Sequence, residues 1–193
     1  MNRKQMTGAI SLAAIGMFAI LGSGSKSAKA QNPNPGDVMT VDVAVDMSTF
    51  NFVPVGGDSM SPNRGTAFIV NGKIYPGGTL PSGAAGNSPD QPGSIGEWIC
   101  KGFLTADLAA QLSGATKIGF DTTQMFLFDG DGQAVWTEGL EAALGPAGPG
   151  TITNRIALGG TGRFRGYAGP VVQQSLGTNA SGAPNIRIHF RAR

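Results

Sequence analysis

Short runs of alternating residues, separated by glycine- and proline-rich turns, constrain this chain more than any other feature. Apolar residues recur at every second position, which is the period of a half-buried β-strand and not of a helix. Only residues 106–112 suggest a short helix of one or two turns. About eight strands are predicted, at residues 38–47, 65–75, 94–104, 117–128, 133–140, 151–158, 163–176 and 186–192.

Composition narrows the choice of fold. Charged residues make up only 13% of the chain, which excludes a long solvated helix or a coiled coil. The 31 glycines follow no Gly-X-Y period, which excludes collagen, and 40% hydrophobic residues argue against full disorder. Closing antiparallel strands into a barrel removes exposed edges. We therefore predict an all-β chain with one eight-stranded antiparallel β-barrel domain at 38–193. Its interior is either filled by side chains or holds one small ligand.

The first thirty residues have the pattern of a secretory signal peptide. Arg3 and Lys4 precede an apolar run at 10–21, and an Ala-Lys-Ala ending closes the segment at residue 30. A membrane anchor is the alternative, but the run is short for a membrane span. We therefore expect a signal peptide at 1–30, a flexible leader at 31–37, and a secreted or periplasmic protein that leaves the membrane after cleavage.

Charge and metal-ligand patterns exclude several partners. Loss of the four basic residues in 1–30 changes the formal net charge from +2 to −2. Six arginines follow Glu141, but they are spread over several strands without interleaved aromatics, so no nucleic-acid partner is predicted. The Asp-Gly-Asp-Gly turn at 129–132 lacks the later ligands of a calcium loop, so no metal site is predicted.

Cys100 is the only cysteine, which excludes an internal disulfide. A lone thiol is usually a small buried hydrophobe. A catalytic thiolate would need a basic partner, and the only histidine is His189. Both interpretations of Cys100 stay open at this point.

The most specific stretch is GGTGRFRGYAG at 159–169. Glycines at this density between two strands permit a tight corner in a barrel. A phosphate-binding loop would instead be followed by a helix, whereas strand-like sequence follows here. We therefore assign a structural role to the motif residues, namely Gly159, Gly160, Thr161, Gly162 and Phe164.

This motif resembles the GGTG-x-F segment of the dirigent proteins and the allene oxide cyclase barrels. Residues 65–68, 95–103, 126–139 and 185–190 resemble other strands of that superfamily. The resemblance implies an eight-stranded barrel, commonly a homotrimer, with an apolar pocket at one end and neither metal nor organic cofactor. Dirigent proteins steer reactive phenolic intermediates, and the cyclases close a fatty-acid epoxide. A small apolar or phenolic ligand is therefore expected.

The candidate catalytic residues are Arg155, Glu138 and Asp121. The resemblance implies that catalytic groups lie on the strand before the glycine motif, where Arg155 is the only charged residue and the acid expected of a cyclase is absent. Arg155 would stabilise a developing oxyanion or enolate. Glu138, on the face of Trp136 and Leu140, would act as general acid or base, with Asp121 as a further polar candidate.

Five further residues are candidate substrate contacts, with packing in the core as the competing interpretation: Trp98, Trp136, Tyr75, Tyr167 and Cys100. The Gly/Ser/Pro-rich segment 76–93 is expected to be a long mobile loop and a lid over the cavity. Two functions compete. One is a cofactor-free cyclase or isomerase. The other is a secreted binding or assembly module without catalysis, which the Asn179-Ala180-Ser181 sequon also fits.

Overall fold

The computed structural model describes residues 37–53, 62–83, 86–130, 132–143 and 148–192. The predicted signal peptide at 1–30 and the leader, except residue 37, lie outside the described residues. Within the described ranges, no helix has the length and hydrophobicity needed to cross a membrane.

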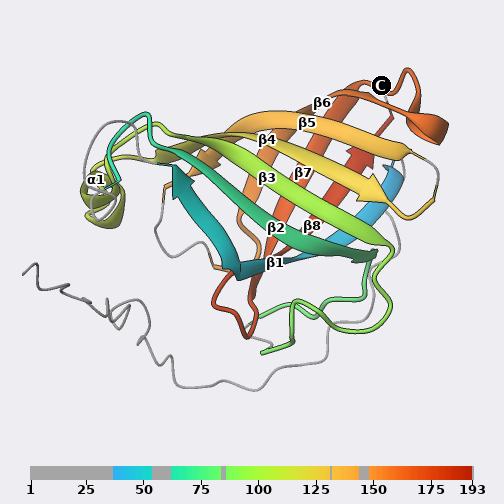
Figure 1. Ribbon diagram of the computed structural model, residues 1–193, viewed down its shortest axis with the longest axis horizontal. Helices are drawn as coiled ribbons and strands as arrows, with labels where there is room; N and C mark the ends of the chain where they lie inside the picture. Colours follow the sequence, from blue (N-terminus) through green and yellow to red (C-terminus); the bar gives the residue numbers. More distant parts are fainter. Residues whose placement is uncertain (1–36, 54–61, 84–85, 131, 144–147, 193) are drawn as a thin grey trace, which may run out of the picture.

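Eight antiparallel strands form a closed barrel in which each strand pairs with its neighbours in sequence and β8 pairs with β1 (Figure 1). This confirms the predicted all-β barrel. The strands are β1 (Asp37–Val53), β2 (Ala67–Pro76), β3 (Gly96–Leu104), β4 (Ile118–Phe128), β5 (Gln133–Ala142), β6 (Ile152–Gly160), β7 (Gly169–Thr178) and β8 (Pro184–Arg191). Two short helices, α1 (Leu108–Leu112) and η1 (Gly162–Phe164), lie in the connections.

Strand alternation sorts side chains between the barrel interior and the outside. In β3, Trp98 and Cys100 are buried in the main core, whereas Glu97 and Lys101 are exposed. The division follows from the period of two, which sends successive side chains to opposite faces. The predicted faces of this strand are therefore confirmed.

Two predicted details are wrong. The predicted strand 163–176 begins only at Gly169, because η1 occupies the first residues and Gly162 takes a φ of +58° that favours glycine. An Asn-Gly pair between apolar runs predicts a hairpin turn or a β-bulge. The hairpin is wrong here because Asn71-Gly72 lies inside β2, whereas the register shift between β1 and β2 does occur opposite Asn71. A Cβ on Gly72 would come within 2.6 Å of the Ala44 carbonyl oxygen, so glycine here permits close strand approach.

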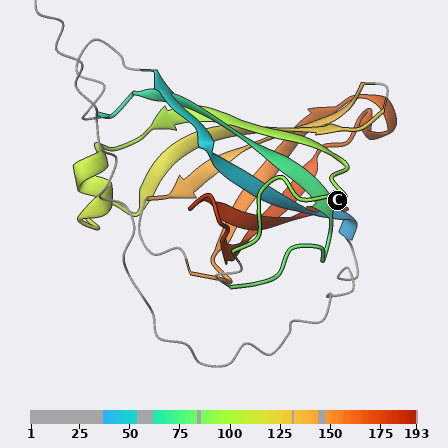
Figure 2. The same cartoon turned by 60° about the horizontal axis from the view of Figure 1, so that its bottom comes forward.

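The loop after β2 is held against the outside of the barrel. Asp42 accepts hydrogen bonds from the backbone N–H groups of Gly78 and Leu80, at 2.9 and 2.8 Å. Its carboxylate also forms an ion pair with Arg187, with 2.7 Å between Nε and Oδ1. Figure 2 shows the loop beside β1 and β8. The expected mobile lid is therefore not observed: the described part of the loop is anchored, and none of its residues lines the interior cavity described below.

Candidate functional site

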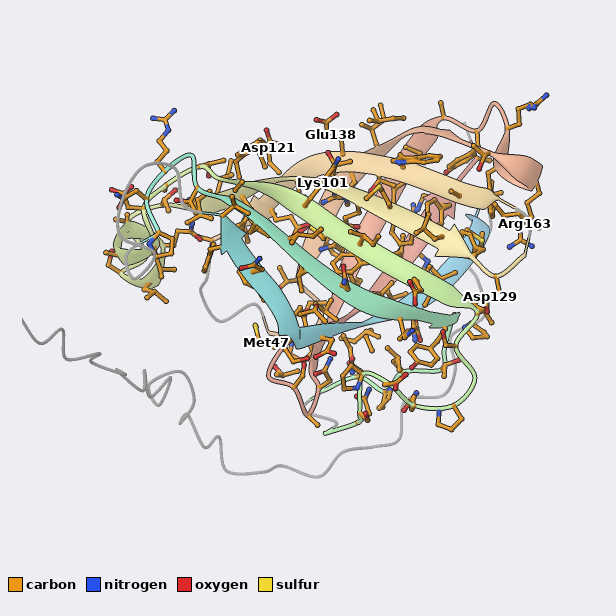
Figure 3. The ribbon with its side chains drawn as sticks, viewed as in Figure 1. Met47, Lys101, Asp121, Asp129, Glu138 and Arg163 are labelled. Carbon is orange, nitrogen blue, oxygen red and sulfur yellow. The ribbon has the colours of Figure 1, made fainter. Side chains whose placement is uncertain are left out.

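A cavity of about 150 Å³ lies inside the barrel, near the end where β1 and β5 finish. Its walls are largely apolar, with polar side chains from β4, β5 and β7 on one side. Met47 and Pro184 line it and are exposed, so the cavity reaches the surface there (Figure 3 labels Met47). The lining residues are Val45, Met47, Phe50, Phe68, Val70, Trp98, Cys100, Phe120, Gln124, Glu141, Gln173, Ala183, Pro184 and Ile186.

A bulge in β1 shapes this opening. The pairing of β1 with β2 shifts register between Asp46 and Asn51, so that additional β1 residues bend away from the ladder. The Asp46 carboxylate accepts hydrogen bonds from the backbone N–H and the hydroxyl of Ser48, at 3.0 and 2.8 Å. Phe50 consequently stacks on Phe68 with 5.4 Å between ring centroids, and both rings line the cavity.

Aromatic side chains close the opposite end of the barrel. The Phe128 and Phe164 rings lie 5.0 Å apart, and the Phe126 and Phe190 rings lie 5.2 Å apart. Gly160 is needed there, because a Cβ would come within 2.6 Å of the Phe164 Cβ. We call this group of aromatic rings the aromatic plug. The glycine motif turns the chain beside the plug, at the end of the barrel away from the cavity.

A buried polar cluster forms one side of the cavity. The Arg155 side chain on β6 is fully buried, and its Nη1 donates to Glu141 Oε1 and to Thr122 Oγ1, both at 2.8 Å. Arg155 Nε donates to Thr137 Oγ1 at 3.1 Å, and Nη2 donates to the Thr122 carbonyl at 2.9 Å. Desolvation by burial lowers the Arg155 pKa, and the Glu141 carboxylate opposes that shift.

Glu141 connects this cluster to the cavity. Its side chain is 24% exposed and lines the cavity, and its Oε1 accepts from Arg155, Thr122 and Gln124. Every hydrogen bond to Glu141 within the described residues goes to Oε1, which leaves Oε2 without a protein donor. The carboxylate is therefore oriented by one oxygen, with the other available to a ligand.

The three predicted catalytic residues do not lie together. Arg155 points into the barrel, whereas Glu138 and Asp121 are exposed on the outer face, beside Lys101 (Figure 3). Alternation explains the separation, because β5 sends Thr137 and Glu141 inward and Glu138 outward. The acid that pairs with Arg155 is Glu141, so the sequence expectation missed the carboxylate that lines the cavity.

The five predicted substrate contacts are also divided. Trp98 and Cys100 line the cavity. Trp136 is half-buried on the outer face, and Tyr167 packs on Phe190 in the aromatic plug with 6.0 Å between ring centroids. Tyr75 is buried beneath the anchored loop, where its hydroxyl lies 2.8 Å from the Pro89 carbonyl oxygen. Only the two β3 residues thus adjoin the interior space.

Cys100 is positioned for packing and not for nucleophilic attack. Burial raises the pKa of its thiol well above the ordinary value of 9.0, so the thiol is neutral near pH 7. His189 projects from the opposite face of the barrel wall, where its Nδ1 lies 3.1 Å from Thr40 Oγ1. The fold therefore separates the two members of the conceivable Cys–His pair.

Comparisons with known proteins give limited similarity. A scan against protein-family models finds no match, and a search of curated proteins also finds none. Among solved structures, a pyocyanin demethylase is similar at 13% sequence identity and a TM-score of 0.49, covering 79% of this chain and 97% of that chain. Similarity at this level supports no inference about activity. The chain is accordingly described as a closed eight-stranded antiparallel β-barrel with an interior cavity.

Proposed function

We propose that this protein binds a small, largely apolar molecule inside the barrel. The observation that carries the proposal is the interior cavity, which is open at one end and walled mainly by apolar side chains. Its volume of about 150 Å³ is that of an apolar cavity able to hold one benzene-sized molecule. A pocket with apolar walls and a few convergent polar groups is typical of small-molecule sites.

The polar side of the cavity favours a binding site over a packing defect. Arg155 and Glu141 form a hydrogen-bonded ion pair, and Gln124 and Gln173 extend the polar surface along the wall. Such groups are costly to bury unless they are paired, and they give a bound molecule a fixed orientation. In line with the signal-peptide pattern, we place this binding outside the cytoplasm, on an apolar or phenolic ligand.

A second candidate function is cofactor-free isomerisation or cyclisation of the bound molecule. The Glu141 carboxylate at the edge of an apolar cavity favours it, because a base acts more strongly where water is excluded. Glu141 would remove a proton from one substrate atom and return it to another. The Arg155 donors are already bonded to Glu141, Thr122 and Thr137, so Arg155 would position the base.

Filling the cavity should weaken binding strongly. Toluene is expected to bind the wild-type protein with a Kd on the order of 1 mM or below by isothermal titration calorimetry. Cys100→Phe places a ring in the space that toluene would occupy, and binding should fall at least tenfold. Met125→Phe, on the outer face of β4, is the matched control and should retain binding. Equal toluene affinity in Cys100→Phe and wild type, with both proteins folded by circular dichroism, would rule out this cavity as the site.

The candidate base can be tested with 5-nitrobenzisoxazole, whose ring N–O bond breaks to give a coloured phenolate when a base removes its C3 proton. We expect Glu141→Gln to lower the rate of ring opening about 100-fold relative to wild type, the scale of a lost general base. Glu138→Gln, on the outer face of the same strand, should leave the rate unchanged. If Glu141→Gln and wild type react equally fast, Glu141 is not the base and binding without catalysis remains.

A further inference from the structure

Two buried polar atoms of cavity-lining side chains have no hydrogen-bond partner among the described residues. They are the indole Nε1 of Trp98 and the amide Oε1 of Gln124. Trp98 is 3% exposed and Gln124 is 1% exposed, and both residues line the cavity. Because nearly all buried polar side-chain atoms in folded proteins are hydrogen-bonded, two unpaired atoms at one cavity require an explanation.

The two side chains are neighbours on adjacent strands. Cys100 on β3 faces Gln124 on β4, so Trp98 is the next inward residue along β3 and lies diagonally from Gln124. Diagonal inward positions of this kind are about 7–8 Å apart, within the reach of an aromatic and a long polar side chain. The two side chains therefore lie within reach of each other on one wall of the cavity.

The hydrogen bonds of Gln124 fix which atom remains unpaired. Its Nε2 donates to Glu141 Oε1 at 2.9 Å and to Gln173 Oε1 at 2.7 Å. A carboxylate oxygen only accepts, so the amide nitrogen must face Glu141, and Oε1 is left as an acceptor. Trp98 offers the opposite chemistry, because an indole N–H only donates.

We propose that Trp98 Nε1 and Gln124 Oε1 form a subsite for a hydroxyl group carried by the apolar ligand. A hydroxyl oxygen accepts from the indole N–H while its own hydrogen is donated to the amide oxygen, which satisfies both atoms. A ketone or an ether satisfies only Trp98. The inference rests on the proposed binding function and narrows the ligands proposed there to compact apolar molecules that carry a hydroxyl group.

The charges around the subsite favour a neutral hydroxyl over an anion. Glu141 is bonded to Gln124, and the donors of Arg155 are occupied by Glu141, Thr122 and Thr137. An anionic ligand would therefore meet a carboxylate without an available cation in the described lining. A trapped water is the other occupant that could satisfy both atoms, and it gives a different result in the following test.

The test compares phenol, anisole and toluene, three single-ring probes of similar shape, by isothermal titration calorimetry on the wild-type protein. Phenol can accept and donate, anisole can only accept, and toluene can do neither. We expect phenol to bind at least tenfold more tightly than toluene, with anisole between them. In Trp98→Phe the preference for phenol over toluene should fall about tenfold, whereas the control Trp136→Phe on the outer face should keep it.

The outcomes separate this inference from the proposed function. If toluene binds as tightly as phenol, a water or nothing occupies the subsite, and the inference is overturned while binding in the cavity stands. If none of the three probes binds, the proposed function fails as well. Should Trp98→Phe not fold, the order of the three probes on the wild-type protein decides the question alone.

Discussion

Arg155→Met is expected to lower the free energy of unfolding by about 3 kcal/mol, because it removes one member of a buried ion pair. The Arg155 side chain is fully buried and is bonded to Glu141, Thr122 and Thr137. Methionine fills part of the volume but leaves the Glu141 carboxylate beside an apolar cavity without its cation. Urea unfolding followed by circular dichroism measures the change, which is a large part of a typical total stability of about 5–15 kcal/mol.

A double variant identifies the cause of that loss. Adding Glu141→Gln to Arg155→Met removes the uncompensated charge, so more than half of the lost stability should return. Glu138→Gln is the matched control, because Glu138 lies exposed on the same strand, and its effect should stay within about 0.5 kcal/mol. An Arg155→Met protein as stable as Glu138→Gln would contradict a stabilising role for the pair.

Asp42→Asn is expected to cost about 3–5 kcal/mol, the scale for breaking a buried charge pair. The Asp42 side chain is fully buried and joins three parts of the chain: β1, the loop after β2, and Arg187 on β8. An asparagine has the same shape, but its NH₂ group faces donors in place of one oxygen. The amide hydrogens of Gly78 and Leu80 should also exchange faster, because asparagine keeps a single neutral acceptor oxygen where the carboxylate offered two charged oxygens to these amides and to Arg187.

An exposed pair supplies the control for this second result. Lys73 and Glu97 lie 2.9 Å apart with side chains 37% and 63% exposed. Lys73→Gln should change the unfolding free energy by no more than about 1 kcal/mol, because water screens such pairs. If Asp42→Asn and Lys73→Gln have equal effects and the exchange of residues 78 and 80 is unchanged, then Asp42 does not anchor the loop.

These two ion pairs act on opposite sides of the barrel wall. Arg155 and Glu141 order the polar side of the cavity inside, and Asp42 and Arg187 hold a loop outside. The loss of stability in Arg155→Met should therefore be accompanied by weaker toluene binding. Asp42→Asn should leave toluene binding nearly unchanged while the protein stays folded, since none of the described residues of the anchored loop lines the cavity.

Much of the fold could be predicted from local sequence. The period of two in β3 placed Trp98 and Cys100 on the buried face and Lys101 on the exposed face, as the structure confirms. The same rule placed Ile188 opposite Arg187 in β8. Alternation is a property of neighbouring residues, so it can be recognised without knowledge of the rest of the chain.

The site was harder to predict because it depends on where strands end and how they pair. The expected fifth strand stopped at residue 140, whereas β5 continues to Ala142, and Glu141 lies in that extension. A predicted strand two residues longer would have placed Glu141 on the same face as Thr137, next to Arg155. Strand ends are set by pairing partners as well as by propensity, and β4 supplies the partner here, with Glu141 opposite Phe120.

The alternating runs and their glycine-rich turns by themselves determined that this chain forms strands, which faces those strands bury, and that a barrel is the simplest closure. Only the tertiary structure decided that aromatic rings fill one end, that a cavity of about 150 Å³ opens at the other, and that Glu141 is the partner of Arg155. The reason is the sequence separation between the residues that interact. Backbone alternation is local, whereas Asp42 meets Arg187 across 145 residues only because the barrel closes.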